Sequence, residues 1–253
     1  MPVTPKPTAM TREDHRYSEG RGFGDPYEGF DFDPVELTLE LDPDRVDPTD
    51  TYALPDLLDE AAIPTDLVDA TELVDVGLAY MAVNRFEQAV DTFERAARFA
   101  GEADETTKQE ALVNMGAAHA ELEEWDAAIG ALEAAVHVAP RGEHAATAES
   151  DLAYALWMFG KDDAALEHAE RALEVDNRFA EAWYNRGFFL NERGLAELAL
   201  ESLENAIRLG YRDAGVLEEK RRALEALGEY DEAETVAEEA EALRERLEED
   251  LVR

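Results

Sequence analysis

Cysteine is absent from the 253-residue sequence, which excludes disulfide bonds and thiolate chemistry. Long apolar runs are absent too: no stretch of 18 apolar residues predicts a membrane span. Residues 1–9 are rich in proline and threonine and lack the apolar segment of a signal peptide. Together these absences predict a cytoplasmic protein that does not enter a membrane.

Motifs for catalysis or metal binding are equally scarce. The five histidines do not form an HExxH motif, and no glycine-rich phosphate loop is present. Asp42, Asp44, Asp47 and Asp50 are spaced like calcium ligands, but the glycine and the terminal glutamate of an EF-hand loop are missing. We therefore expect no enzyme activity, with no catalytic residue, no cofactor and no bound metal.

Basic residues are few in this chain. It has 23 basic residues against 61 acidic ones, a net charge of −38, and only four of the basic residues are lysine. Nucleic-acid binding requires a basic face that displaces counterions. The best basic cluster, residues 220–222, directly follows Glu218 and Glu219. The sequence therefore predicts that the protein does not bind nucleic acid.

The acidic charge is spread through the chain rather than gathered in a tail. Residues 180–253 alone contain 20 acidic and 10 basic residues. Carboxylates retain water and cations when salt is high, and a Debye length of about 3 Å at 1 M salt screens their repulsion. The composition resembles that of proteins from halophilic archaea, so we predict a salt-rich cytosol.

A pattern of small residues recurs five times along the chain. One alanine returns at steps of 39, 37, 34 and 34 residues, and a second alanine seven residues later keeps the same steps. A small residue precedes each of the first four pairs, and Arg221 takes its place in the fifth. The first alanines are Ala89, Ala128, Ala165, Ala199 and Ala233, the second are Ala96, Ala135, Ala172, Ala206 and Ala240, and the preceding small residues are Gly77, Gly116, Ala153 and Gly187.

This pattern resembles the tetratricopeptide-repeat family over residues 70–240, since 34 residues is the length of that repeat. The resemblance implies an all-α fold, a right-handed α-solenoid of about five helix pairs that stack to bury their apolar faces. We expect the solenoid to occupy residues 65–253, with Thr65 or Asp66 capping the first helix. Residues 241–249 continue the helical pattern and would cap the C-terminal end.

Residues 1–60 predict a disordered or extended acidic arm. Val35, Leu37, Leu39 and Leu41 alternate with polar residues, which favours one β-strand. That strand could add to a partner's sheet, pair with its own copy in a dimer, or lie along the helices. The preceding segment, residues 23–32, contains Phe30 and Phe32 among its aromatics and could fold back onto the repeats.

The resemblance also implies a binding surface, because the first helix of each repeat lines a concave groove in this family. Relatives that hold an acidic chaperone tail use a Lys/Arg clamp there, whereas the clamp positions here carry Val, Asn, Asp and Glu. We therefore expect an apolar peptide as the ligand. The predicted partner-binding residues are Val74, Leu78, Met81, Val113, Asn114, Asp151, Tyr154, Trp157, Tyr184, Asn185 and Phe188.

Three functions are compatible with this sequence. The favoured one is a scaffold or adaptor that binds a segment of a partner protein or peptide in the concave groove. The alternative is a non-catalytic structural subunit of a larger complex, which uses the N-terminal strand to add to a partner's sheet. A third is an accessory to an enzyme or chaperone. The pattern does not identify the partner.

Overall fold

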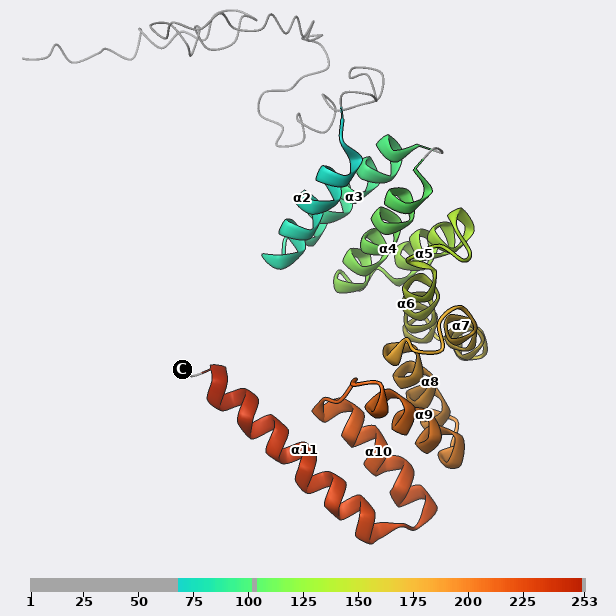
Figure 1. Cartoon of the computed structure of the whole chain (residues 1–253), viewed down its shortest axis with the longest axis vertical. Helices are drawn as coiled ribbons and strands as arrows, with labels where there is room; N and C mark the ends of the chain where they lie inside the picture. The colour runs from blue at the N-terminus through green and yellow to red at the C-terminus, as the bar shows by residue number, and fades with distance from the viewer. Residues whose placement is uncertain (1–67, 102–103, 252–253) are drawn as a thin grey trace, which may run out of the picture. The chain divides into compact units, whose positions relative to one another are not determined.

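The computed structural model describes residues 68–101 and 104–251 (Figure 1). This part of the chain forms ten α-helices and contains no strand, which confirms the predicted all-α solenoid. The predicted arm and strand, with Phe30, Phe32 and residues 35–41, lie outside the described residues. The helices are α2 (Ala70–Ala82), α3 (Phe86–Ala100), α4 (Glu105–Glu121), α5 (Trp125–Val138), α6 (Ala145–Met158), α7 (Asp162–Val175), α8 (Ala180–Glu192), α9 (Ala196–Arg208), α10 (Ala214–Leu227) and α11 (Tyr230–Leu251).

The helices form five pairs, α2/α3 to α10/α11, and the two members of each pair pack against each other. The turn inside each pair contains one residue in the left-handed backbone conformation, with φ between 56° and 84°. These residues recur at the same steps of 39, 37, 34 and 34 as the alanines. They are Asn84, Glu123, Gly160, Gly194 and Gly228.

Within three of the pairs, a glycine of the first helix lies against a large side chain sixteen residues later. A Cβ atom on Gly77 would lie 2.4 Å from the Phe93 ring, and one on Gly116 would lie 2.5 Å from Leu132 Cγ. The third pair has Ala153 and Ala169 at the equivalent positions, and both are fully buried. In each case a glycine faces a large side chain or two alanines face each other. The combined volume stays small, so the backbones of the two helices approach closely. The third glycine is Gly187, against Leu203.

The fifth pair follows a different arrangement. Arg221 stands at the position of the small residue, and its guanidinium pairs with Glu218 (2.5 Å) and with Glu225 on the surface of α10. The contact with α11 is made instead by Leu217 and Leu224, which pack with apolar side chains of that helix. The predicted departure at Arg221 therefore changes the packing of the last pair without abolishing it.

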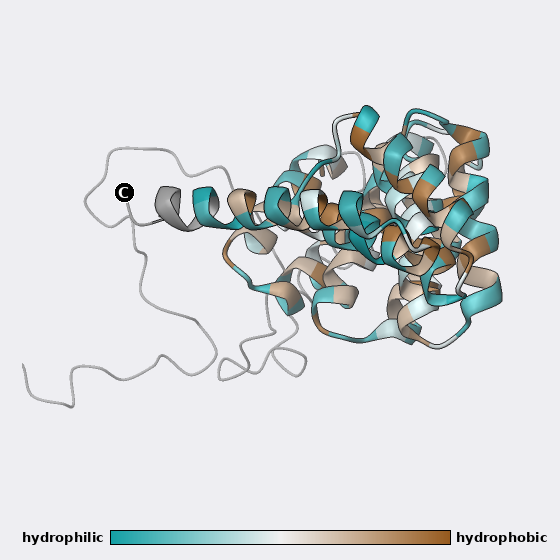
Figure 2. Ribbon diagram, turned by 90° about the horizontal axis from the view of Figure 1, so that it is seen from below, coloured by the Kyte–Doolittle hydropathy of each residue, from teal (hydrophilic) through white to brown (hydrophobic). Residues whose placement is uncertain are grey.

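The first helices of neighbouring pairs also contact one another, along the series α2, α4, α6, α8 and α10. In Figure 1, α2, α4 and α6 lie on the inner side of the stack, and α5 and α7 lie on its outer side. Hydrophobic and hydrophilic residues alternate along the helices (Figure 2), and the buried side chains are mostly alanine and larger apolar residues. We call the exposed side of these five first helices the inner surface.

The helix ends are defined by aspartates and turn residues. The Asp69 carboxylate caps α2 by accepting hydrogen bonds from the N–H groups of Thr71 (2.9 Å) and Glu72 (3.4 Å). Thr65 or Asp66 was predicted as this cap, so α2 begins later in the chain than expected. The residues predicted as a C-terminal cap do not form a helix of their own. They continue α11, which runs without interruption from the fifth pair to Leu251.

Candidate functional site

The predicted partner-binding residues occupy the first helices, but they differ in exposure. Leu78 and Tyr154 are the most exposed, at 41% and 42%. Six others are half-buried: Met81, Asn114, Asp151, Trp157, Tyr184 and Phe188. Val74, Val113 and Asn185 are buried, at 1%, 6% and 5%, because they are on the side of their helices that faces neighbouring helices. These three side chains pack inside the solenoid and offer no surface to a partner.

Asn185 is one of the predicted partner-binding residues, but its buried amide bonds to a neighbouring helix instead. Its Nδ2 donates to Ser150 Oγ at 3.0 Å, which links α8 to α6 across two repeats. Further along α8, Asn191 Nδ2 donates to the Glu219 carbonyl at 2.9 Å and so links α8 to α10. Both amides therefore hold neighbouring first helices together, and they fix the spacing of the side chains on the inner surface.

Aromatic rings bridge the third and fourth repeats. The Trp157 ring stacks on Phe189, with centroids 4.9 Å apart and planes at 20°, and it meets Phe188 edge-on at 5.6 Å. Tyr154, one turn before Trp157 on α6, meets Trp125 edge-on at 6.1 Å. Trp157 and Phe188 thus contribute to packing between repeats and keep part of each side chain exposed. Because these rings pack against one another, they have less conformational freedom to lose on binding.

Two carboxyl groups share this region of the inner surface. Burial, together with the negative charge of Glu181, raises the pKa of Asp151 to about 7. Burial also raises the pKa of the Glu181 carboxyl itself. Within the described part of the chain, neither carboxyl has a hydrogen bond or ion pair that would lower its pKa. Among the described residues, the site therefore holds two acidic groups with no basic side chain bonded to them.

Two tyrosines contact each other in the same region, and Glu181 acts on one of them. The rings of Tyr184 on α8 and Tyr211 in the α9–α10 turn are 5.5 Å apart and tilted by 44°. Burial, with the nearby charge of Glu219 as the next cause, raises the pKa of Tyr184 to about 12, and Tyr154 also contributes. Burial, and then the charge of Glu181, raises the pKa of Tyr211. The ring contact places Tyr184 beside Tyr211, and Tyr211 is the tyrosine on which the charge of Glu181 acts.

Two residues of this site were missed in the sequence. Glu181 precedes Tyr184 by three residues and Phe188 by seven on the same helix, so helical periodicity could have placed it on the same face. Tyr211 lies in a turn, where no periodicity indicates its direction. Its contact with Tyr184 depends on how the fourth and fifth pairs stack, which is a property of the fold.

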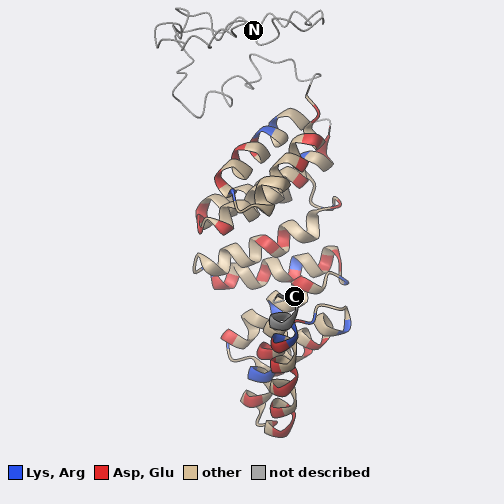
Figure 3. Ribbon diagram, turned by 90° about the vertical axis from the view of Figure 1, so that its left-hand side faces the viewer, with Lys and Arg blue, Asp and Glu red and all other residues tan. Residues whose placement is uncertain are grey.

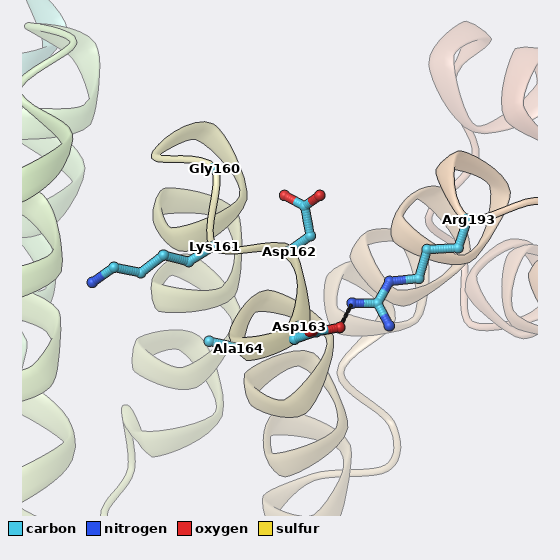
Figure 4. A pocket seen from close by; sticks show the side chains of 6 residues that line it. All are labelled: Gly160, Lys161, Asp162, Asp163, Ala164 and Arg193. Carbon is cyan, nitrogen blue, oxygen red and sulfur yellow. Dashed lines mark hydrogen bonds and ion pairs between the residues drawn. The ribbon is translucent and has the colours of Figure 1, made fainter.

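Other depressions on the surface are structural. One surrounds the α6–α7 turn, where Asp163 Oδ1 is 2.6 Å from Arg193 Nη2 and joins the third pair to the fourth (Figure 4). Lys161 extends away from that ion pair and lies over the Phe159 ring, 5.2 Å from its centroid. Asp163 and Arg193 already neutralise each other, and the depression is wide open. It therefore offers no group that would bind a ligand selectively.

Two further observations concern chemistry and location. Among residues 68–101 and 104–251, no group of three or more histidine, aspartate or glutamate side chains is placed to hold a metal ion. No helix in that part of the chain is long and apolar enough to cross a membrane.

Known proteins share this repeat and this fold. Residues 107–178, from the first turn of α4 to just beyond α7, match the family model of the tetratricopeptide repeat. No curated protein matches the sequence. Among solved structures, a thermophilic TPR protein of Thermus thermophilus is similar with a TM-score of 0.57 and 21% identity, over 73% of this chain and 100% of that one.

Two other solved structures have the same arrangement of helices. MamA from Desulfovibrio magneticus RS-1 is similar with a TM-score of 0.56 and 17% identity, over 70% of this chain and 96% of that one. BtubC from P. vanneervenii gives a TM-score of 0.61 and 17% identity, over 70% of this chain and 80% of that one. At these identities the likeness shows the fold alone. With the repeat match, it supports a tetratricopeptide-repeat protein.

Proposed function

We propose that the protein is a non-catalytic interaction scaffold, which binds a segment of a partner protein on its inner surface. The observation that carries this proposal is the group of half-exposed aromatic side chains on neighbouring first helices, Tyr154, Trp157, Tyr184 and Phe188. Each is fixed by a ring contact or by a position between repeats. Aromatic residues with fixed rings are the side chains that most often dominate protein interfaces.

The repeat match and the similar structures support the general role, because tetratricopeptide solenoids generally bind other proteins or peptides. A salt-rich cytosol remains part of the proposal and rests on the net charge of −38. If it holds, the free energy of unfolding should rise when KCl is increased from about 0.1 M to 2 M, because screening relieves repulsion between carboxylates. A fall or no change would remove this part of the proposal.

The test of the binding surface is a selection of random peptides on the full chain, followed by mapping of the contact. Each selected peptide is resynthesised with a photo-crosslinking residue, and mass spectrometry identifies the helices that become labelled. We expect labels on α6 and α8. Labels confined to the second helices, such as α7 and α9, or a selection without binders, would refute the proposal.

A further inference from the structure

Resting on the proposed function, we infer that the inner surface recognises a cationic side chain, a lysine or arginine of the partner segment. The structure assigns this role to Asp151 and Glu181 with the rings of Tyr154, Tyr184 and Tyr211, which we call the cation site. This differs from the apolar peptide that the sequence predicts. The difference comes from how the third, fourth and fifth pairs stack.

The first argument is charge. Asp151 on α6 and Glu181 on α8 repel each other in a partly desolvated place, where electrostatic interactions are stronger than in water. Of the basic residues on α8 and α10, Arg186 bonds to Glu170 and Ser202, and Lys220 pairs with Glu204 and Glu232. These cations are already engaged elsewhere, so a ligand is left to supply the charge.

The remaining arginines of α10 are engaged in the same way. Arg221 pairs with Glu218 and Glu225, and Arg222 pairs with Glu192 at 2.6 Å and with Glu219 at 3.0 Å. Acidic residues are spread over the helices in Figure 3, in keeping with the net charge of −38. The field at the cation site is therefore negative, which attracts cations from a distance as well as at contact.

The second argument is the tyrosines. A guanidinium or ammonium group is attracted to the face of an aromatic ring, and this attraction adds to that of a carboxylate. Tyr184 and Tyr211 present two rings 5.5 Å apart beside Glu181, and Tyr154 is exposed to 42%. Rings and carboxylates together are the groups that recognise a long cationic side chain, whose methylene stem can pack on the aromatic faces.

The same residues disfavour other occupants. A purely apolar segment would cover both carboxyl groups without giving them a partner, which costs free energy. An acidic segment would add further negative charge to this region. A segment with one lysine or arginine among apolar residues satisfies the carboxylates and covers Trp157 and Phe188 at once. Charge complementarity therefore selects the cationic segment over both alternatives.

The experiment uses the peptides selected on the full chain and crosslinked to α6 or α8. Their affinity is measured at fixed KCl for the wild-type protein and for the double variant Asp151→Asn, Glu181→Gln. The matched control is Glu133→Gln, Glu201→Gln, which removes two exposed charges from the second helices α5 and α9. In parallel, citrulline, the neutral isostere of arginine, replaces the arginine of those peptides that carry one. This gives a second measurement that uses the wild-type protein alone.

We expect inner-surface peptides to carry a lysine or arginine at a constant position. Their affinity should fall about tenfold or more in the Asp151→Asn, Glu181→Gln variant and with citrulline, and less than about threefold in the control. Inner-surface peptides that lack a basic residue, or that bind the double variant undiminished, would overturn this inference and leave the scaffold proposal standing. Failure of every peptide to label the inner surface would remove both.

Discussion

Replacing Gly116 by alanine should destabilise the protein, although alanine is the better helix former by about 1 kcal/mol. The new Cβ would lie 2.5 Å from Leu132 Cγ and 2.8 Å from Leu132 Cδ2, about 1 Å closer than carbon atoms pack. Leu132 is 1% exposed and lies between the fully buried Ala128 and Ala135, so it cannot move aside. Overpacking of this kind costs roughly 1–3 kcal/mol, and this overlap belongs at the upper end.

The expected net change is therefore a loss of about 2 kcal/mol in the free energy of unfolding, measured by urea denaturation followed by circular dichroism. Gly130 provides the matched control, because it lies in helix α5 with no atom within 4 Å of a Cβ placed there. Gly130→Ala should stabilise by about 0.5–1 kcal/mol. Equal effects of the two substitutions would refute the close helix approach.

A double variant separates steric overlap from other causes. Leu132→Ala alone should cost about 2–5 kcal/mol through lost burial and a cavity. In that background, Gly116→Ala should become neutral or stabilising, since the pair then matches Ala153 and Ala169 of the third repeat. A coupling energy of about 2 kcal/mol or more is expected for residues in direct contact. Additive effects would show that the two residues do not touch.

Three further predictions concern single side chains. The pKa of Asp151 is about 7 in the folded protein against 3.8 as its ordinary value, so only the folded state holds the proton between these values. The free energy of unfolding should consequently fall as pH rises from about 4 to 7. In urea titrations at pH 5 and pH 8, this difference should disappear in the Asp151→Asn variant. If the variant has the same pH profile as the wild type, the burial of this carboxyl is contradicted. Gln109→Ala should lower the free energy of unfolding by about 2–4 kcal/mol, because the buried amide donates to the Ala135 and Ala139 carbonyls and accepts from the His144 N–H. As a control, Gln88→Ala removes a half-buried amide and should lower it by less than about 1 kcal/mol. Glu123 has φ 58°, so Glu123→Gly should raise the thermal midpoint and stabilise by about 0.5–1 kcal/mol, and a loss of stability would show that its side chain contributes more than its backbone costs.

Much of the fold is predictable from the sequence because helix pairs leave a local, periodic signal. The alanine steps fix where the five pairs lie, and the turn residues Asn84 to Gly228 follow the same steps. The start of the first helix was less predictable. Asp69, Asp66 and Thr65 are all good capping residues, and the choice among them depends on where packing of α2 on α3 begins.

The candidate site was predictable only in part. Periodicity places residues on a helix face, but a face of about 100° is wider than the exposed strip, so Val74, Val113 and Asn185 were assigned to the surface although they are buried. Gln109 gave no signal at all: its polar side chain suggests exposure, yet it is fully buried and holds the backbone of the α5–α6 turn. Its partners lie 26 to 35 residues away.

The chemistry of the inner surface arises from the stacking of repeats rather than from any one repeat. Asp151, Glu181 and Tyr211 belong to three different segments, and each has an ordinary local sequence. Stacking of α6, α8 and the α9–α10 turn brings their side chains together, removes water from the three ionisable groups, and raises the pKa of each. Because the amides of Asn185 and Asn191 set the spacing of these helices, changing either amide should disturb the cation site without touching it. The amides that link the first helices and the carboxyl groups that would bind a cation are therefore different residues on the same helices.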